Sequence, residues 1–381
     1  MSATMIRSAL SLAFGAMLSM PMFAHATIVT TTTVEFAMPT HSVSDTLGAN
    51  RTKSDGATTR SNVLLGTSSV AKFNKDLGVL TGVALDMTST HKQLTEVKTA
   101  GTTDGDNKGN VSATGSGSST VKLGLPASMT SATSTSSSVS KVDNCGGKPK
   151  DACGDGVSTQ QANFNVKAGA SSLNNYAGTG SFSVDHVATS VLADTTANGF
   201  SSTATTTSTV DWYGSLSATY SYLLHAAQSF DGNGSVGSLT LNFGDIFLGD
   251  TVADQTFSIF NLTGDRVGLE LTNIDKSGDV DAFSTNLGLF GGLAAGASNS
   301  FNVSFLTSKT GSFGAEYKLS LADVAPEYFA SNTLGANYGL TLKLLGNVVE
   351  RPIENDVPEP ATLMLLGLGV AALGASRKRR A

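Results

Sequence analysis

The chain offers few residues whose type and spacing could do chemistry, and the clearest are its only two cysteines, Cys145 and Cys153. They stand in a Ser-rich, then Gly- and Lys-rich segment that indicates a long surface excursion. If the chain is exported, a lone pair of cysteines this close in sequence predicts a disulfide. Closing a loop of about nine residues would stabilise the folded state by roughly 2.5 kcal/mol. Free or regulatory thiols are the alternative, whereas a metal site needs four ligands and no histidine lies nearby.

Acidic turns are the second chemical feature, because oxygen ligands at alternate positions can wrap a calcium ion. The residues concerned are Asp104, Asp106 and Asn110 in one turn, and Asp275, Asp279 and Asp281 in another. Lys108 occupies a ligand position in the first turn, and neither turn has the distal Glu of an EF-hand. Solvated turn acids are therefore the preferred interpretation, and we predict no metal and no cofactor.

Catalysis has little support in the sequence. No nucleophile elbow, HExxH motif or phosphate-binding Gly loop is present. The histidines of the body are isolated and are interpreted as ordinary strand or surface residues: His41, His91, His186 and His225. Glycoside hydrolysis needs only two carboxylates, for which Asp185 and Asp211 are candidates, but nothing in their local sequence sets them apart. We predict no catalytic residue and a protein that is not an enzyme, with a secreted all-β polysaccharide-active hydrolase as the alternative.

The amino-acid composition indicates that these residues lie in a chain made of β-strands and turns. Charged residues make up 14% and aromatic residues 7%, and there are 41 glycines, which is unlike a helical cytosolic enzyme. Thr fits a pleated, half-solvated surface, and Gly and Asn supply turns. Interspersed Val, Leu and Phe argue against disorder, the other interpretation of Ser/Thr richness. The net charge of −6 and the lack of a basic stripe before the C-terminal tag argue against nucleic-acid binding.

Alternation of apolar and polar residues runs through residues 27–230. Val83, Leu85 and Met87 are spaced by two, which places them on one face of a sheet. This pattern predicts an antiparallel β-sandwich or jelly-roll-like domain, and the choice between a sandwich and a more open roll stays open. The nearby aromatic residues are assigned to the core or to strands rather than to a sugar platform: Trp212, Tyr213, Tyr220 and Tyr222.

A second domain follows a Gly-rich stretch. Residues 231–238 are predicted to be a flexible linker. Residues 239–350 show short strands with turn residues at regular spacing, which predicts an Ig-like β-sandwich. Residues 351–356 are predicted to be a further linker.

The N-terminus, residues 1–26, predicts a secretory signal peptide. Arg7 supplies a positive start, the run over 9–23 is apolar, and Ala24 and Ala26 are the small residues that a signal peptidase accepts. Cleavage is expected after Ala26. The alternative, a buried helix, conflicts with the strand pattern that begins at Thr27.

The C-terminus predicts a transmembrane helix. Residues 361–376 would span roughly 24 Å as a helix, which is short of a hydrocarbon core of about 30 Å unless the bilayer thins or basic side chains snorkel. The basic cluster that follows predicts a cytoplasmic stop-transfer signal, and it consists of Arg377, Lys378, Arg379 and Arg380.

The residues before this helix carry a resemblance. Val357-Pro358-Glu359-Pro360, an apolar helix and a terminal basic cluster resemble, over residues 357–381, the PEP-CTERM sorting signal. The resemblance implies recognition by an exosortase, a membrane-embedded cysteine-type transpeptidase, and processing near Pro-Glu-Pro. It also implies a companion of exopolysaccharide and biofilm systems in Gram-negative bacteria. A single-pass anchor with accidental prolines is the alternative.

Both domains also resemble known families. "FNKDLGVLTGVALDMTS", "LNNYAGTGSFSVD" and "SLSATYSYLL" are similar to choice-of-anchor domains of type E. "NFGDIFLGD", "FSIFNLTGD", "AFSTN", "FNVSFLTSKTGSF" and "LKLLGNVV" are similar to the ASPM-SPD-2-Hydin and choice-of-anchor D group. The first family has no assigned activity, and domains of the second bind or space partners, so these resemblances imply location rather than chemistry.

Together these features predict an all-β chain of two antiparallel β-sandwich domains, the second Ig-like, with an N-terminal signal helix and a C-terminal transmembrane helix. The expected role is that of a non-enzymatic exported surface protein with a structural or adhesive function in an exopolysaccharide or biofilm matrix. Its expected partners are signal peptidase, an exosortase and exopolysaccharide. Its expected location is first the inner membrane, through the C-terminal helix, and then the cell surface or matrix of a Gram-negative bacterium.

Overall fold

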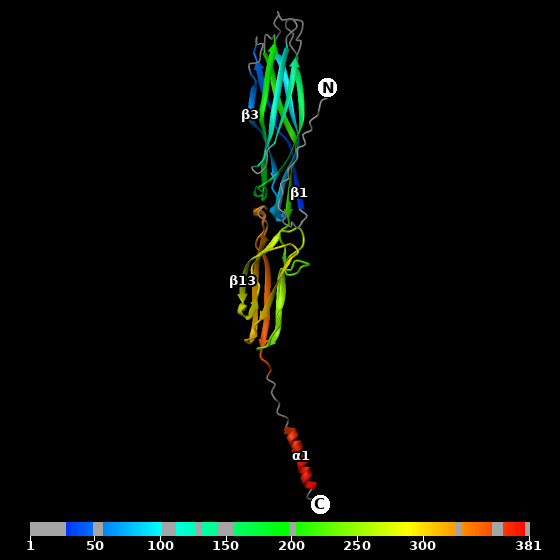
Figure 1. The fold of residues 1–381 in the computed structure, drawn as a ribbon, viewed down its shortest axis with the longest axis vertical. Coiled ribbons are helices and arrows are strands. Elements are labelled where there is room, and N and C mark those ends of the chain that lie inside the picture. Colours follow the sequence, from blue (N-terminus) through cyan, green and yellow to red (C-terminus); the bar gives the residue numbers. More distant parts are fainter. Residues whose placement is uncertain are drawn as a thin grey trace, which may run out of the picture.

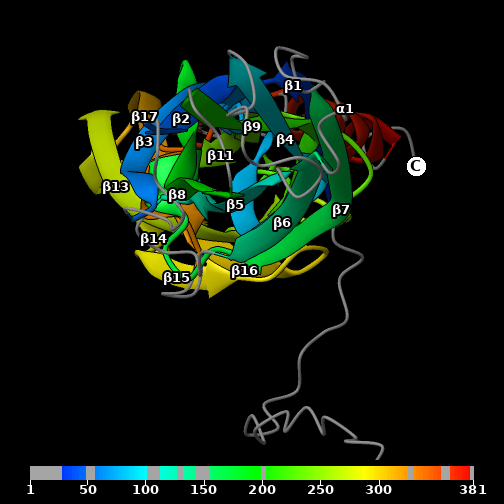
Figure 2. The same ribbon diagram turned by 90° about the horizontal axis from the view of Figure 1, so that it is seen from above.

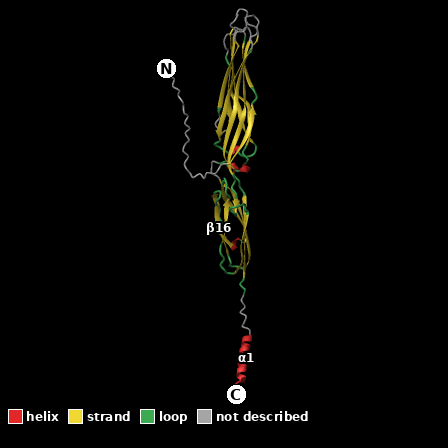
Figure 3. Cartoon of the chain, turned by 90° about the vertical axis from the view of Figure 1, so that its right-hand side faces the viewer, coloured by secondary structure: helices red, strands yellow, loops and turns green. Residues whose placement is uncertain are grey.

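The computed structural model describes residues 28–48, 56–100, 112–126, 132–142, 155–198, 203–324, 329–352 and 361–377. Strands dominate the chain, and they form two β-sandwich bodies that stack end to end along the long axis (Figures 1 and 3). The prediction of an all-β fold with two sandwiches is confirmed. The sheets are antiparallel except for one parallel pair, β11 with β18, in the second body.

The first body contains β1 to β9 in two sheets. One sheet has the order β1-β9-β4-β7, with β2 also on β9, and its strands are β1 (Ile28–Ala37), β2 (His41–Leu47), β4 (Val79–Ala100), β7 (Gly156–Gly169) and β9 (Thr203–Leu223). The other has the order β3-β8-β5-β6, and its strands are β3 (Thr58–Ala71), β5 (Ser112–Gly124), β6 (Thr133–Val142) and β8 (Ser181–Asn198). Two short 3-10 turns, η1 (Lys75–Leu77) and η2 (Asn174–Tyr176), lie in the connections.

The two sheets of the first body meet along both of their edges. Seen along the long axis, β6 of one sheet lies beside β7 of the other, and β2 lies beside β3 (Figure 2). The strand β9 spans the whole body, because it pairs with β2 over its first half, with β1 over its second half and with β4 throughout. The structure is therefore a sandwich rather than the more open roll that the sequence left possible.

The part of this sandwich near the second body has an apolar core around the only tryptophan of the chain. Trp212 is fully buried, and its indole Nε1 donates to Ser89 Oγ at 3.0 Å. The rings of Phe36, Phe164 and His186 lie around it, with ring centroids 4.7–6.0 Å from the indole. Its burial removes a large aromatic surface from water, which favours the packed state of both sheets.

The next layer of the same sandwich, between this core and a small apolar cluster that includes Leu47 and Val97, is filled by polar side chains. His91, Gln93 and Thr95 alternate on the inner face of β4 and are fully buried. His91 Nε2 lies 2.8 Å from Ser119 Oγ, and Thr95 Oγ1 lies 2.6 Å from Ser138 Oγ. Hydrogen bonds between the sheets thus take the place of apolar packing, and such bonds stabilise a buried layer when its groups find partners.

Glycine allows the sheets to approach closely here, which gives a first prediction. A Cβ at Gly117 would lie 2.2 Å from Thr95 Oγ1, so we expect Gly117→Ala to lower the free energy of unfolding of the first body by about 1–3 kcal/mol. Urea unfolding followed by Trp212 fluorescence measures this loss. Gly169→Ala is the matched control, because a Cβ there would meet its nearest atom at 3.9 Å. Equal midpoints for the two variants would contradict the prediction.

The Thr-rich composition is explained by the outer face of the β9 sheet. Hydroxyl groups pair across the strands in a regular ladder, with Oγ to Oγ distances of 2.8–3.2 Å. The pairs are Thr31–Thr219, Thr33–Ser217, Ser42–Thr209, Ser44–Thr207 and Thr46–Thr205. Such cross-strand pairs stabilise a solvated face and fix its register.

The second body contains β10 to β18, again in two sheets. One sheet has the order β10-β12-β16-β14, and its strands are β10 (Gln228–Ser229), β12 (Gln255–Asn261), β14 (Phe283–Thr285) and β16 (Ser298–Phe305). The other has the order β11-β18-β17-β13-β15, and its strands are β11 (Ser238–Phe247), β13 (Gly268–Gly278), β15 (Phe290–Leu293), β17 (Gly311–Val324) and β18 (Tyr338–Val349). The 3-10 turns η3 (Val280–Ala282) and η4 (Ser331–Thr333) complete it.

The segment predicted to be a flexible linker, residues 231–238, has a different structure. Ser229 Oγ donates to Gly234 O and accepts from the backbone N–H groups of Asp231 and Val236. Phe230 is buried in the core of the second body. Gly and Asn therefore mark a closed, hydrogen-bonded loop here, because one buried hydroxyl holds three backbone groups.

The two bodies share packing and hydrogen bonds where they meet. Val79, at the start of β4, packs in the core of the second body, and Ala330, just before η4, packs in the core of the first. The Ala330 N–H donates to Leu80 O at 3.0 Å, and the Leu80 N–H donates to Thr333 Oγ1 at 3.1 Å. Each body thus supplies part of the core of the other, which holds the two bodies in contact.

Candidate functional site

The helix predicted near the C-terminus is present as α1 (Ala361–Arg377). Its described apolar side chains are exposed to solvent, for example Met364 at 77% and Leu373 at 70%. Within the described part of the chain, no helix is both long and apolar enough to cross a membrane. The helix is therefore confirmed, and its spanning of a membrane is not.

Most of the other predicted sorting residues lie outside the described residues. These are Val357, Pro358, Glu359 and Pro360 of the motif, Lys378, Arg379 and Arg380 of the basic cluster, and Ala24 and Ala26 of the signal peptide. Arg377 is the last residue of α1. Cys145 and Cys153 also lie outside the described residues, so the disulfide stays a prediction.

The second body ends in an anchored segment just before the sorting motif. Arg351 follows β18 and forms an ion pair with Asp250. Its guanidinium also lies over the Phe247 ring, with Cζ 5.6 Å from the ring centroid. Leu248 N–H donates to Val349 O at 2.9 Å. The chain thus leaves the body at a defined point, although an exposed ion pair contributes little to stability.

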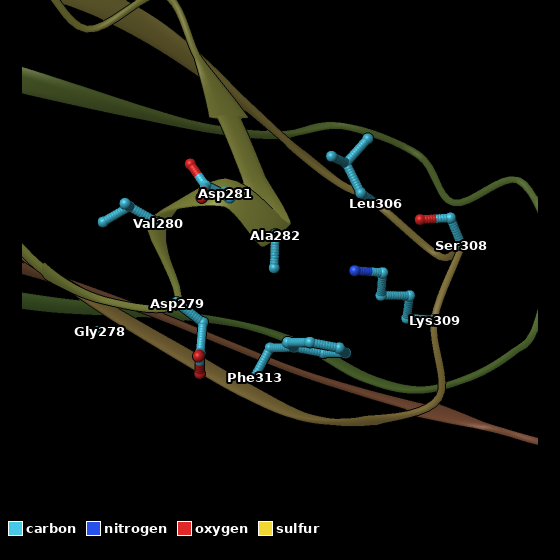
Figure 4. Close-up of a pocket in the computed structure, with 9 residues that line it drawn as sticks. All are labelled: Gly278, Asp279, Val280, Asp281, Ala282, Leu306, Ser308, Lys309 and Phe313. Atoms are coloured by element: carbon cyan, nitrogen blue, oxygen red, sulfur yellow. The ribbon is translucent and has the colours of Figure 1, made fainter.

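A pocket with a volume of about 330 Å³ lies at the same end of the second body, between η3 and the loop before β17 (Figure 4). The carboxylate of Asp279 accepts the Gly314 N–H at 2.9 Å, so it caps the loop. Lys309 and Phe313 also line the pocket. Among the described residues, no group of three or more His, Cys, Asp or Glu side chains could hold a metal ion.

The acidic turns divide between the described and the undescribed parts of the chain. Asp104, Asp106 and Asn110 lie outside the described residues. Asp275, which was predicted to lie in the second turn, lies in β13 instead and accepts a hydrogen bond from Asn273 Nδ2 at 3.0 Å. Its carboxylate and that of Asp279 are thus engaged in local hydrogen bonds.

The carboxylates nominated for hydrolysis do not meet. Asp185 projects outward from β8, between the buried residues Val184 and His186, and accepts from Thr67 Oγ1 at 3.2 Å. Asp211 projects outward from β9 in the opposite sheet and accepts from Thr40 Oγ1 at 2.7 Å. Packed sheets lie about 10 Å apart, so these outward groups are too far apart to flank one glycosidic bond.

The aromatic residues near them form no exposed platform. Trp212 and Tyr220 are buried, and the Tyr220 hydroxyl donates to Ala71 O. Burial raises the pKa of Tyr220 to about 12. Tyr213 is 42% exposed, and Tyr222 packs against the core. The assignment of Trp212 and Tyr220 to the core is confirmed.

Two histidines of the first body are buried between the sheets. Burial lowers the pKa of His91 to about 4 and that of His186 to about 4. His186 Nε2 lies 2.9 Å from Ser68 Oγ. Both rings are therefore neutral at pH 7, and their burial excludes contact with a bulky substrate.

Asp323 is a polar centre at the junction of the bodies that was not predicted from the sequence. This buried carboxylate accepts the Ala226 N–H at 2.8 Å and the Gly335 N–H at 2.6 Å. It also lies 3.2 Å from the Tyr338 hydroxyl and 2.6 Å from His225 Nδ1. The sequence contains no pattern that marks this site, because the partners of Asp323 are separated from it along the chain and come together only in the folded structure.

Comparison with solved structures gives only weak likenesses. An ASH / PapD-like domain of human CEP192 is 14% identical, with 30% of this chain and 82% of that chain covered and a TM-score of 0.22. WR4, a C. elegans MSP family member, is 9% identical, with 27% and 91% covered and a TM-score of 0.19. A nucleoside hydrolase-related hypothetical protein from Saccharophagus degradans is 18% identical, with 34% and 26% covered and a TM-score of 0.18. TM-scores this low carry no argument.

Comparison with curated proteins gives no match. The resemblances to choice-of-anchor and ASPM-SPD-2-Hydin domains are not confirmed and stay predictions. One family does match, over residues 356–380, and it is the PEP-CTERM protein-sorting motif. It covers almost the same residues as the predicted signal, and it marks an exported protein that an exosortase processes.

Proposed function

We propose that this protein is a non-enzymatic surface protein with a structural or adhesive role in an extracellular polysaccharide matrix. The observation that carries the proposal is the sorting motif at residues 356–380, directly after a folded and anchored body. Signal peptidase would remove residues 1–26, and the C-terminal segment would hold the chain at the inner membrane until the exosortase acts. The two bodies would then stand at the surface of a Gram-negative cell or in its matrix, where exopolysaccharide is the partner.

Features of the two bodies support a structural role. Their described surfaces carry paired hydroxyl ladders and locally bonded acids rather than a convergent set of reactive groups. The shared packing of Val79 and Ala330 makes the bodies an elongated unit (Figure 1). Elongated β-sandwich units suit spacing or adhesion, since their function depends on shape rather than on a reactive centre.

The experiment is intact-mass analysis of the protein from cell fractions, with and without the sorting enzyme of the host. We expect the combined variant Pro358→Ala, Glu359→Ala and Pro360→Ala to keep its C-terminal segment and to remain with the membrane fraction. The reason is that two prolines keep this segment extended and accessible to the transpeptidase.

The matched control is Glu350→Ala with Pro352→Ala, which removes the same residue types just before the motif. This variant is expected to be processed as the native chain is. An unchanged mass and location in cells without the sorting enzyme would refute the exosortase step. A surface-exposed, processed protein that leaves matrix cohesion unchanged when deleted would refute the structural role alone.

A further inference from the structure

His225 lies between the two bodies and touches both. It follows β9 and precedes β10 along the chain. Its Nδ1 lies 2.6 Å from Asp323 Oδ2 in β17 of the second body. Its Nε2 lies 2.8 Å from the backbone oxygen of Lys75 in η1 of the first body. The imidazole ring is thus a direct bridge from one body to the other.

Both partners of the ring are hydrogen-bond acceptors. A backbone carbonyl oxygen can only accept, and the Asp323 carboxylate already accepts the N–H groups of Ala226 and Gly335. A neutral imidazole has one N–H, so it can serve only one of these partners. The observed geometry therefore requires the doubly protonated ring, with the Nε2–H donating to Lys75 O and the Nδ1–H donating to Asp323.

We propose that His225 is a proton-dependent lock between the two bodies. The charged ring ties the Lys75 carbonyl to Asp323, and the loss of one proton leaves one of these acceptors without its donor. The junction can then bend. This inference concerns the mechanics of the two bodies and does not depend on the sorting step.

The groups around His225 decide in which direction the lock responds to pH. The hydrogen bond with Asp323 has the largest effect and raises the pKa of His225. Burial lowers this pKa, whereas the hydrogen bond with the Lys75 carbonyl and the charges of Asp323 and Asp76 raise it further. Arg266 Nη1 donates to His225 O at 2.9 Å. The charged or titratable groups on the elements around His225 are Lys75 and Asp76 on η1, Asp323 on β17, Tyr338 on β18, and Asp265 and Arg266 before β13.

The sign of the effect follows from this raised pKa. The folded-state pKa lies above the ordinary 6.5, so the contribution of the lock is fully present below pH 6.5. It is lost as the pH rises through the folded-state pKa. The lock is therefore closed below pH 6.5 and opens as the pH rises through the raised folded-state pKa of His225.

Other contacts across the junction do not titrate and remain as a pivot. The Ala330 N–H bond to Leu80 O and the Leu80 N–H bond to Thr333 Oγ1 involve no ionisable group. Asn332 Nδ2 also donates to Asn174 O at 2.9 Å. Opening the lock should thus let the bodies bend about these contacts without separating.

The test is a distance measurement between spin labels on the two bodies of the full chain. Ser183→Cys on β8 and Ser284→Cys on β14 provide exposed attachment sites, in a background in which Cys145 and Cys153 are replaced by Ser. Over a series of pH values, we expect one narrow distance distribution at about pH 6 and a broad one once the pH has risen above the His225 pKa. His225→Gln carries both of its N–H groups on one nitrogen and so cannot place a donor at both ring positions, and its distribution should be broad at every pH.

A matched control and a second measurement keep the test decisive. His41→Gln changes a histidine of β2 that takes no part in the junction, so it should keep the native response to pH. The ring ¹⁵N shifts of His225 in the native chain should show both nitrogens protonated below pH 6.5. Equal distributions at all pH values, or a native-like response in His225→Gln, would overturn the proposal.

Discussion

Replacing Asp323 by alanine should lower the free energy of unfolding of the protein by about 3–5 kcal/mol. The side chain is fully buried and holds two backbone N–H groups, a tyrosine hydroxyl and a histidine ring. Without the carboxylate these donors stay buried and unpaired, and each unpaired buried group costs about 1–3 kcal/mol. The loss should fall on the second body and the junction, where all the partners lie.

Urea unfolding followed by circular dichroism measures this loss. Trp212 fluorescence, recorded on the same samples, reports the first body alone because it is the only tryptophan. Hydrogen exchange at the amides of Ala226 and Gly335 adds a local readout, since both should lose protection in Asp323→Ala.

Two further variants control the Asp323 experiment. Asp275→Ala removes an exposed carboxylate of the same body that is bonded only to a neighbouring side chain, so its effect should stay within about 0.5 kcal/mol. Asp323→Asn keeps one acceptor oxygen and should give an intermediate loss. If Asp323→Ala and Asp275→Ala unfolded at the same urea concentration, the central role of Asp323 would be wrong.

The strands of the first body were predictable because their physics is local. Val83, Leu85 and Met87 alternate with polar residues in the sequence and point into the core in the structure. A side-chain period of two follows from the pleat, so it survives any choice of partner strand. The same is true of the C-terminal helix, whose apolar run is continuous.

The polar inter-sheet layer was not predictable from the same pattern. His91, Gln93 and Thr95 also alternate, but their chemistry points to a solvated face when only the sequence is considered. Ser119 and Ser138 of the other sheet supply hydrogen-bond partners for His91 and Thr95, and Ser208 of the neighbouring strand β9 supplies one for Gln93. Burial of a polar side chain depends on partners distant in sequence, which a single strand does not reveal.

The functional residues also fall into a group that was predictable from the sequence and a group that was not. The sorting motif was predictable because a processing enzyme recognises a short linear segment, and the matched residues 356–380 are contiguous. His225 and Asp323, which are 98 positions apart, appeared as an isolated histidine and an unremarked acid. Only the docking of the bodies brings their side chains to within 2.6 Å.

The first body should lose most of its stability between pH 6.5 and pH 4. His91 and His186 have folded-state pKa values of about 4, below the ordinary value of 6.5. Below pH 6.5 the unfolded chain binds protons that the buried rings do not, so stability falls as the pH falls. Each lowered pKa corresponds to at most about 3 kcal/mol, and both together approach the whole stability of a typical domain.

The emission wavelength of Trp212 measures this acid transition, because exposure of a buried indole shifts its emission. Wavelength is preferable to intensity, since the His186 ring lies 4.7 Å from the indole and its protonation would alter the intensity directly. The interval from pH 6.5 to about pH 5 is the most informative, because carboxylates ordinarily titrate near pH 4.

The double variant His91→Gln and His186→Gln should flatten this acid slope. An unchanged slope in the double variant would assign the acid sensitivity to carboxylates instead. The response of the junction has the opposite sign, because protonation of His225 favours its bridge to Lys75 and Asp323. Acid should therefore weaken the first body while the junction stays closed, and a rise of the pH through the His225 pKa should open the junction while the first body stays folded. Because the two pH responses have opposite signs, they distinguish the buried histidines of the first body from His225 at the junction. A single measurement of global stability would report only the sum of the two responses.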